Sequence, residues 1–208
     1  MSRILHIEAS PSKERSHTRA VASAFLAAYE RAHPDDVIET LDVWSLELPP
    51  FDAAALDAKF AVLRRNVFTT GQLARWEALR AVSRHFNSAD KYVFSVPMWN
   101  FGIPYPLKHY IDVVTLPGEN WTWSRERGYG TILTGKKALL VHASANVHEE
   151  SGKYADDFQK PYMRRWLQFL GIDDVQEITI APTLASPEEV AARRTSAMAA
   201  AEQLAAAF

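Results

Sequence analysis

Hydroxyl side chains gather in residues 10–18, between an apolar run (residues 4–9) and an amphipathic stretch. A strand that leads into a helix in this way presents unpaired backbone N–H groups and the positive end of the helix dipole, and both favour a phosphate. The hydroxyls of Ser10, Ser16 and Thr18, with the N–H groups of Ser16, His17 and Thr18, could complete a phosphate cradle. The same residues also fit an ordinary serine cap in a polar loop.

The segment excludes several kinds of phosphate chemistry. It lacks the Gly-Lys-Ser/Thr of the nucleotide triphosphate loop and the G-x-G-x-x-G pattern of dinucleotide sites. The chain contains no cysteine, which removes thiolate phosphatases, disulfides and cysteine-ligated metals. No H-E-x-x-H motif or paired histidine spacing indicates a metal site. A monophosphate that anchors a ligand permanently therefore fits better than a phosphate that is hydrolysed.

A second segment whose side chains could bind a ligand follows the apolar run 92–96. Pro97 must end a strand ladder, and Pro104 and Pro106 suit the first turn of a helix. The residues held between these prolines offer a thioether, two aromatic rings and an amide, which suit a flat ring with polar edges: Met98, Trp99, Asn100 and Phe101. A rigid corner of the core is the alternative interpretation. A phosphate cradle and a ring clamp on neighbouring strands together describe a site for flavin mononucleotide (FMN).

The elements that must position these segments alternate regularly along the chain. Apolar runs of strand length occur at residues 4–9, 37–43, 92–96, 138–143 and 175–180, and amphipathic stretches separate them. A final helix is predicted at Ser186, where Pro187 and Glu189 complete a capping box. This alternation predicts one α/β domain over residues 1–208, a doubly wound five-stranded parallel sheet with helices on both faces. Ligands in such folds bind beyond the carboxyl ends of the strands.

Composition narrows the class of protein further. The 208 residues carry a net charge of −2, which indicates neither a nucleic acid nor an anionic membrane as partner. There is no apolar window of about 18 residues and no signal-peptide pattern at the N-terminus. We therefore expect a cytoplasmic protein that acts on a small molecule.

Two segments, Pro97-Met-Trp-Asn-Phe-Gly-Ile-Pro104 and Leu107-Lys-His-Tyr-Ile-Asp112, resemble the signature of the FMN-dependent NADH-azoreductases and related NAD(P)H:quinone reductases. The resemblance extends over nearly the whole chain. It implies a flavodoxin-like fold and a homodimer with FMN at its interface. It also implies ping-pong transfer of electron pairs from NADH or NADPH to quinones, azo compounds or similar flat aromatic acceptors. The flavin performs this chemistry, so no side-chain nucleophile is required.

The loop after the fourth strand departs from this family pattern. Relatives usually carry Ser-Arg-Gly-Gly there, whereas this chain has Ala143, Ser144, Ala145 and Asn146. The resemblance places these four residues at the pyrimidine edge of the ring. Asn146 can still adopt the left-handed conformation that a glycine would supply, whereas Ala145 pays more for it. His148 keeps the family's place.

The walls of the substrate slot are expected to be aromatic. Trp99, Trp121 and Trp123 lie in segments interpreted as loops, and Trp121 and Trp123 are assigned to the slot with His148. The helical stretch 53–86 exceeds what one crossover needs, so part of it should form a dimer interface. Phe60, in that stretch, is expected to approach the partner's flavin.

Two other classes of function remain open. A flavodoxin-type electron carrier would share the fold, although carriers are commonly more acidic for docking than a net charge of −2 allows. A binding protein that keeps the fold with weakened FMN affinity is the other alternative, because of the altered residues 143–146.

Overall fold

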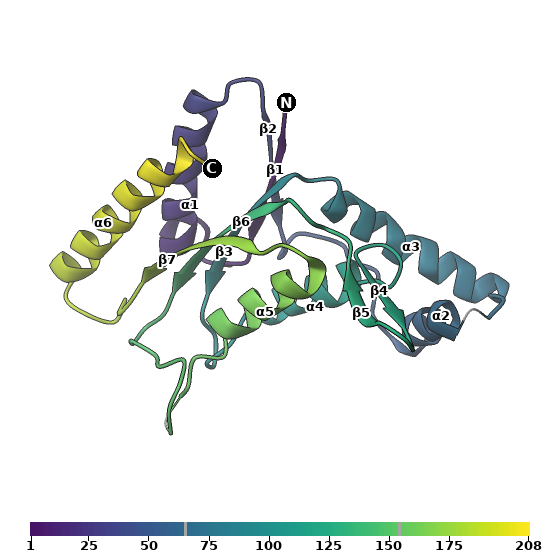
Figure 1. Ribbon diagram of the computed structural model, residues 1–208. Coiled ribbons are helices and arrows are strands. Elements are labelled where there is room, and N and C mark those ends of the chain that lie inside the picture. Colours follow the sequence, from purple (N-terminus) through teal and green to yellow (C-terminus); the bar gives the residue numbers. More distant parts are fainter. Residues whose placement is uncertain (65, 154) are drawn as a thin grey trace.

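A five-stranded parallel sheet in the order β2-β1-β3-β6-β7 forms the centre of the molecule (Figure 1). The computed structural model describes residues 1–64, 66–153 and 155–208. The strands of the sheet are β1 (Arg3–Glu8), β2 (Val37–Asp42), β3 (Lys91–Pro97), β6 (Lys137–Ala143) and β7 (Asp174–Ile180). This strand order confirms the predicted doubly wound sheet. Strands that are covered on both faces require uninterrupted apolar runs, which is the pattern that the sequence shows.

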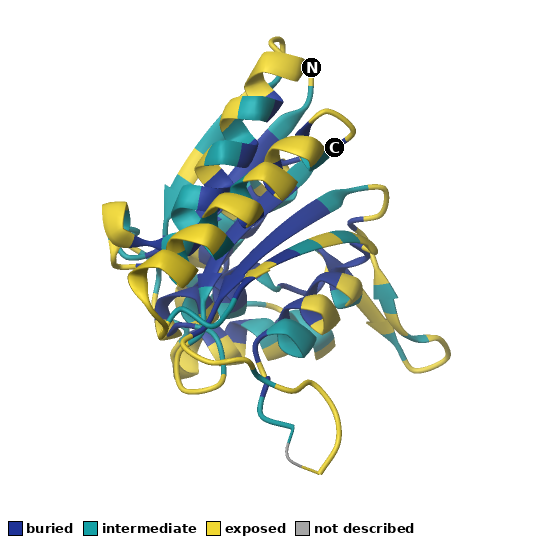
Figure 2. Ribbon diagram, turned by 90° about the vertical axis from the view of Figure 1, so that its left-hand side faces the viewer, coloured by how far each residue is buried: buried dark blue, intermediate teal, exposed yellow. Residues whose placement is uncertain are grey.

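Helices cover both faces of this sheet. Helices α1 (His17–Ala32) and α6 (Pro187–Ala205) pack together on one face, whereas α3 (Thr70–Asn87), α4 (Tyr105–Val114) and α5 (Lys160–Leu170) lie on the other (Figure 1). Successive residues of β3 point to opposite faces, so Val93 joins the cluster under α1 and α6, whereas Tyr92 and Phe94 join the larger cluster. The strands in the centre are accordingly buried (Figure 2).

The long helix expected over residues 53–86 is two helices, α2 (Ala53–Arg64) and α3. The hydroxyl of Thr69 accepts a hydrogen bond from the N–H of Gln72, and the Gln72 side chain bonds back to the N–H of Thr69. This capping box begins a new helix, since it pairs N–H groups that have no partner at a helix start.

A hairpin stands where loops were expected. Strands β4 (Trp121–Ser124) and β5 (Gly128–Thr131) pair in antiparallel register. The rings of Trp121 and Tyr129 pack on Phe169 of α5, with centroids 5.5 and 5.6 Å from that ring. A Cβ at Gly130 would lie 2.6 Å from the Thr122 hydroxyl, so only glycine fits there. Packing against α5 thus holds the hairpin.

Within the described part of the chain, we find no helix that is both long enough and apolar enough to cross a membrane.

Candidate cofactor site

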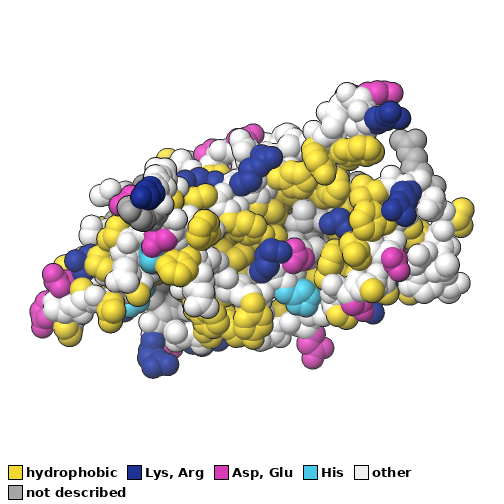
Figure 3. Space-filling model, turned by 90° about the horizontal axis from the view of Figure 1, so that it is seen from below, with side chains coloured by type: hydrophobic (Ala, Val, Ile, Leu, Met, Phe, Trp, Pro, Cys, Tyr) yellow, Lys and Arg dark blue, Asp and Glu magenta, His cyan; other side chains and the backbone are white. Residues whose placement is uncertain are grey.

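A cavity of about 240 Å³ opens at the carboxyl edge of the sheet, where the loops after four strands meet. Figure 3 shows this end of the molecule from below, with hydrophobic side chains gathered across it. The lining residues come from the loops after β1, β3, β6 and β7: Ser10, Ser12, Arg15, Ser16, His17, Thr18, Pro97, Met98, Ala143, Ser144, Ala145 and Thr183. No acidic residue is among them, so the cavity suits an anion.

The segment after β1 brings together the residues that were predicted to form a cradle. Ser16 is the N-cap of α1: its hydroxyl accepts from the N–H of Arg19 at 3.2 Å and lies 3.1 Å from the Thr18 hydroxyl. Ser10 is buried beside them. The N–H groups of His17 and Thr18 lie in the first helical turn, where no carbonyl of the helix can reach them. The structure therefore brings Ser10, Ser16, His17 and Thr18 together, as the sequence predicted.

A partly exposed cluster of charged groups surrounds the buried carboxylate of Glu8 next to this loop. The Glu8 carboxylate, at the end of β1, lies 3.4 Å from the Arg19 guanidinium and 3.9 Å from the Lys13 ammonium. Burial raises the pKa of Glu8, while the two cations oppose that rise. Lys13 also pairs with Asp42 and has a left-handed backbone, with φ of 47°. The acids are thus neutralised on the far side of the loop.

The turn after β3 is strained. The N–H and C=O groups of Trp99 and Gly102 bond to each other, at 2.9 and 3.0 Å, around a two-residue loop. Both loop residues are left-handed, with φ of 47° at Asn100 and 69° at Phe101, as a type I′ turn demands. Asparagine tolerates this conformation, but phenylalanine pays about 1–2 kcal/mol for it. The Phe101 side chain is nevertheless 50% exposed. An exposed aromatic ring on a strained backbone indicates a binding surface.

The other residues of the ring clamp are held from the side. The N–H of Met98 donates to the C=O of Ala143 at 2.7 Å, which joins the loops after β3 and β6. The indole of Trp99 packs on Trp44, with ring centroids 5.4 Å apart. The indole N–H of Trp44 in turn donates to the C=O of Ala9. Of the residues predicted to clamp the ring, Met98 lines the cavity, whereas Trp99, Asn100 and Phe101 are not among its lining residues.

Asn146 does not use the left-handed conformation that is accessible to asparagine. The non-glycine residues with positive φ, among those described, are Lys13, Asn100 and Phe101. The hydroxyl of Ser144 donates to the C=O of Asn146 at 2.7 Å, so a side chain closes this turn and no positive φ is needed. Ala143 and Ser144 are buried at the cavity wall, whereas Ala145 and Asn146 are exposed.

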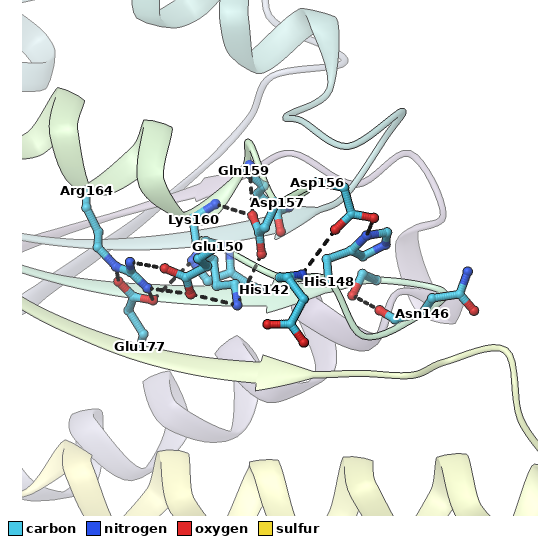
Figure 4. Close-up of polar contacts among 12 residues, drawn as sticks. His142, Asn146, His148, Glu150, Asp156, Asp157, Gln159, Lys160, Arg164 and Glu177 are labelled. Carbon is cyan, nitrogen blue, oxygen red and sulfur yellow. Dashed lines mark hydrogen bonds and ion pairs between the residues drawn. The ribbon is translucent and has the colours of Figure 1, made fainter. Parts of the chain in front are cut away.

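The rest of the loop between β6 and α5 is tied down by ionic contacts (Figure 4). The Glu150 carboxylate pairs with Lys160 at 2.9 Å and with Arg164, and these cations lower the pKa of Glu150 to about 2. The Asp157 carboxylate accepts from the N–H groups of Gln159 and Lys160 at the start of α5. Phe158 precedes α5 and is exposed.

The predicted substrate residues divide into three groups. Trp121 is 5% exposed and belongs to the core, so its assignment to the slot wall is wrong. Phe60 and Trp123 are exposed at 41% and 51%, but neither lines the cavity of this single chain. His148 lies edge-on to Phe101, with centroids 5.8 Å apart, and thus stands beside the ring clamp.

Four further lining residues were not predicted as site residues: Ser12, Arg15, Pro97 and Thr183. Thr183 follows β7, and its N–H and hydroxyl both donate to the C=O of Ser144, at 2.9 and 3.1 Å. Because β7 neighbours β6 in the sheet, the loop after it reaches the cavity. The signal was present in the sequence, since the carboxyl ends of all parallel strands meet at one edge.

Comparison with known proteins agrees with this geometry. Residues 2–205 match a family described by its flavodoxin-like fold. The chain is 41% identical to FMN-dependent NADH:quinone oxidoreductase 9 of Burkholderia lata, over 88% of this chain and 89% of the relative. It is 38% identical, over the full length of both chains, to FMN-dependent NADH:quinone oxidoreductase of Nitratidesulfovibrio vulgaris.

Solved structures agree as well. An azoreductase from Bacillus anthracis superposes with a TM-score of 0.88 at 26% identity, with full coverage of both chains. A Bacillus anthracis FMN-dependent NADH-azoreductase in complex with FMN gives a TM-score of 0.83 at 26% identity, with 99% of this chain and 100% of that chain covered. The chain belongs to the same family as the FMN-dependent NADH:quinone oxidoreductases, a family with the flavodoxin-like fold.

Proposed function

We propose that this protein is an FMN-dependent enzyme that passes electron pairs from NADH or NADPH to quinones, azo compounds or similar flat aromatic acceptors. One observation carries the proposal: a single cavity joins the hydroxyl cradle after β1 to Pro97 and Met98, which lead into the strained turn after β3, and to the start of the loop after β6. The names of the relatives, which specify FMN, NADH and quinone, support it.

The residues present fit FMN. The cradle offers hydroxyls and free N–H groups without an acid in the lining, which is what a phosphate needs. We assign the phosphate to Ser10, Ser16, His17 and Thr18. The flat ring is assigned to the clamp and to the loop after β6: Met98, Trp99, Asn100, Phe101, Ala143, Ser144, Ala145 and Asn146. When bound, FMN supplies the hydride chemistry, and the protein orients the ring and keeps competing reactants away.

The substrate slot is proposed to form between two copies of the chain. Phe60 and Trp123 are large apolar side chains exposed outside the cavity, and Figure 3 shows hydrophobic groups spread over this end of the molecule. Burying them against a second copy would place aromatic walls over the ring, with His148 beside it. A homodimer in the cytoplasm, with no nucleic acid or membrane partner, is the assembly that we propose.

The absorption spectrum of the purified protein tests the function. Bound oxidised flavin gives bands near about 370 and 450 nm, which NADH should bleach and a quinone should restore. A colourless protein that cannot be reconstituted with FMN would favour the binding-protein alternative. Flavin that NADH does not reduce, and that only a protein partner reduces, would favour the electron carrier.

Removing two donors from the cradle should weaken FMN binding. Ser16→Ala with Thr18→Val is expected to cost roughly 1–3 kcal/mol of binding free energy, because two hydroxyl contacts to a charged group are lost. Flavin fluorescence titration of the apoprotein measures this. Ser186→Ala is the matched control: Ser186 caps α6 as Ser16 caps α1, but it lies outside the cavity. Equal FMN affinity in both variants would place the phosphate elsewhere.

The assembly is tested by light scattering at micromolar concentration. We expect a dimer, and we expect Phe60→Asp to shift it towards monomer with loss of quinone reduction, because a charge would be buried in an apolar interface. Val37→Asp, at an exposed position on the edge strand β2, should leave the dimer intact. A fully active monomer would contradict the proposed slot.

A further inference from the structure

The loop between β6 and α5 contains a histidine–carboxylate pair. The Nδ1 atom of His148 lies 2.9 Å from Oδ2 of Asp156 (Figure 4). Within the described part of the chain, Nε2 of His148 has no hydrogen-bond partner, and it is not among the fully buried polar atoms. One ring nitrogen is therefore engaged, and the other is left for a ligand.

The loop holds Asp156 rigidly for this contact. Its Oδ1 atom accepts from the N–H of Glu149 at 3.1 Å, and its own N–H donates to the C=O of Glu149 at 3.0 Å. The hydrogen bond from His148 lowers the pKa of Asp156, so this group is a carboxylate at neutral pH. A carboxylate at Nδ1 selects the tautomer with the proton on Nδ1 and stabilises the imidazolium.

Two other acidic groups of this region pair with cations of α5. Glu150 points to Lys160 and Arg164, and Asp157 pairs with Lys160 at 3.1 Å (Figure 4). The Glu149 side chain is exposed, and its contact with Asp156 is through the backbone. From the turn after β3, the uncharged ring of Phe101 faces His148. The Asp156 carboxylate is in direct contact with the His148 ring.

The pair stands next to the ring clamp. The His148 ring meets Phe101 edge-on, with centroids 5.8 Å apart. The N–H of Phe158, two residues after Asp156, donates to the C=O of Phe101 at 2.9 Å. At its other end the same loop begins with Ala143, Ser144 and Ala145 in the cavity wall. Both ends of the loop are therefore fastened to the site, with the pair between them.

We propose that Asp156 is a positioning residue that holds His148 as the proton donor to the acceptor. This rests on the proposed function. Reduction of a quinone to a hydroquinone takes one hydride, which the FMN supplies, and one proton. The Nε2–H bond of the His148 imidazolium breaks, and an O–H bond forms on the substrate oxygen. Water then returns a proton to Nε2. The proton on Nδ1 stays on the ring throughout and remains hydrogen-bonded to the Asp156 carboxylate.

Stopped-flow measurement of the two half-reactions tests the proposal. In Asp156→Asn, we expect the reoxidation of reduced enzyme by benzoquinone to slow at least about tenfold, because general acid catalysis contributes factors of about 10²–10⁴. The wild-type rate should fall as the pH rises, since the protonated histidine is the active form, and the variant should lose this dependence. FMN affinity and reduction by NADH should stay within about twofold.

Two comparisons make the outcome decisive. His148→Gln should slow reoxidation at least as much, and adding Asp156→Asn to it should have no further effect, because the two residues act as a unit. Glu149→Gln, whose exposed side chain has no role in the pair, is the matched control. Equal slowing of both half-reactions in Asp156→Asn, unchanged reoxidation, or additive effects in the double variant would overturn the proposal.

A second measurement needs no FMN. Imidazole nitrogen NMR of the apoprotein reports the tautomer of His148. We expect the proton on Nδ1 in the wild type and on Nε2 in Asp156→Asn, because the asparagine amide can donate to Nδ1. The same tautomer in both proteins would overturn the role of Asp156. Failure of the wild type to bind FMN would instead contradict the proposed function and leave this result readable.

Discussion

Lowering the pH from about 7 to about 5 is expected to reduce the free energy of unfolding by about 4 kcal/mol, roughly 2 kcal/mol for each of two buried histidines. Burial lowers the pKa of both His6 and His142 from 6.5 to about 4. Above pH 6.5 neither group is charged in the folded or the unfolded chain. Between pH 6.5 and 4 the unfolded chain takes up protons that the folded chain refuses, so stability falls.

The surroundings of the two histidines explain why they stay neutral. His6, in β1, lies 2.7 Å from the Ser95 hydroxyl and 3.3 Å from that of Thr40, and the charge of Arg19 adds to the effect of burial. His142, in β6, has no hydrogen-bond partner among the described residues.

Charged groups of both signs surround His142. The carboxylates of Glu177 and Asp157 favour its protonation, and the cations Lys160 and Arg164 oppose it. Burial is the larger influence, so the ring is neutral in the folded protein at pH 7.

Urea unfolding at several pH values measures this loss. The window above about pH 5 keeps the histidines apart from the carboxylates, whose ordinary pKa values lie near 4. His142→Leu should remove about half of the pH dependence, because leucine occupies a similar space without a titrating group. A free energy of unfolding that stays level between pH 7 and pH 5 would show that protonated forms of these histidines are accommodated in the fold.

Trp166→Ala is expected to cost about 3–5 kcal/mol of stability, a large part of the total for a domain of this size. Trp166, on α5, is 6% exposed and contacts the rings of Phe86 and Phe94, with centroids 5.7 and 5.8 Å away. Its indole N–H donates to the Thr115 hydroxyl at 2.9 Å. Truncation would leave a cavity between α5 and the sheet and would remove this hydrogen bond, while the Thr115 hydroxyl would still donate to the C=O of Ile111.

Trp166→Phe separates packing from hydrogen bonding. Phenylalanine keeps most of the ring contacts and loses the N–H, so we expect this variant to lose only about 1–2 kcal/mol. Urea unfolding of both variants at neutral pH gives the difference. Similar losses in the two variants would mean that the Thr115 hydrogen bond, and not the packed volume, dominates at this position.

The sheet could be predicted from the sequence because its signal is local. Each strand buried on both faces is a short apolar run between turn residues. The β4–β5 hairpin has no such signal: its two strands have four residues each and depend on Phe169, which lies far along the chain. The division between α2 and α3 was readable, since Thr69 and Gln72 have the spacing of a capping box.

The site was predictable in its residue types but not in its backbone. The hydroxyls of the cradle lie where the helix start requires them. The sequence suggested positive φ at Asn146, where relatives have glycine, yet the left-handed residues are Asn100 and Phe101. No propensity favours phenylalanine there. The two reciprocal hydrogen bonds between Trp99 and Gly102 impose the conformation, and these depend on the packing of the whole corner.

The two helical layers lie on opposite faces of the sheet (Figure 1), and the residues assigned to the site come from both. Ser16 and Thr18 begin α1, in the layer that contains α6, whereas the turn at Asn100 leads into α4 in the opposite layer. A molecule in which either layer has opened locally would keep half of the cofactor contacts. Ligand affinity is therefore available only to the completely folded chain, and ligand binding shifts the population towards that state. In a cell, a bound cofactor would thus lower the fraction of partly open molecules. Proteases degrade those open molecules, so the completely folded protein would be protected.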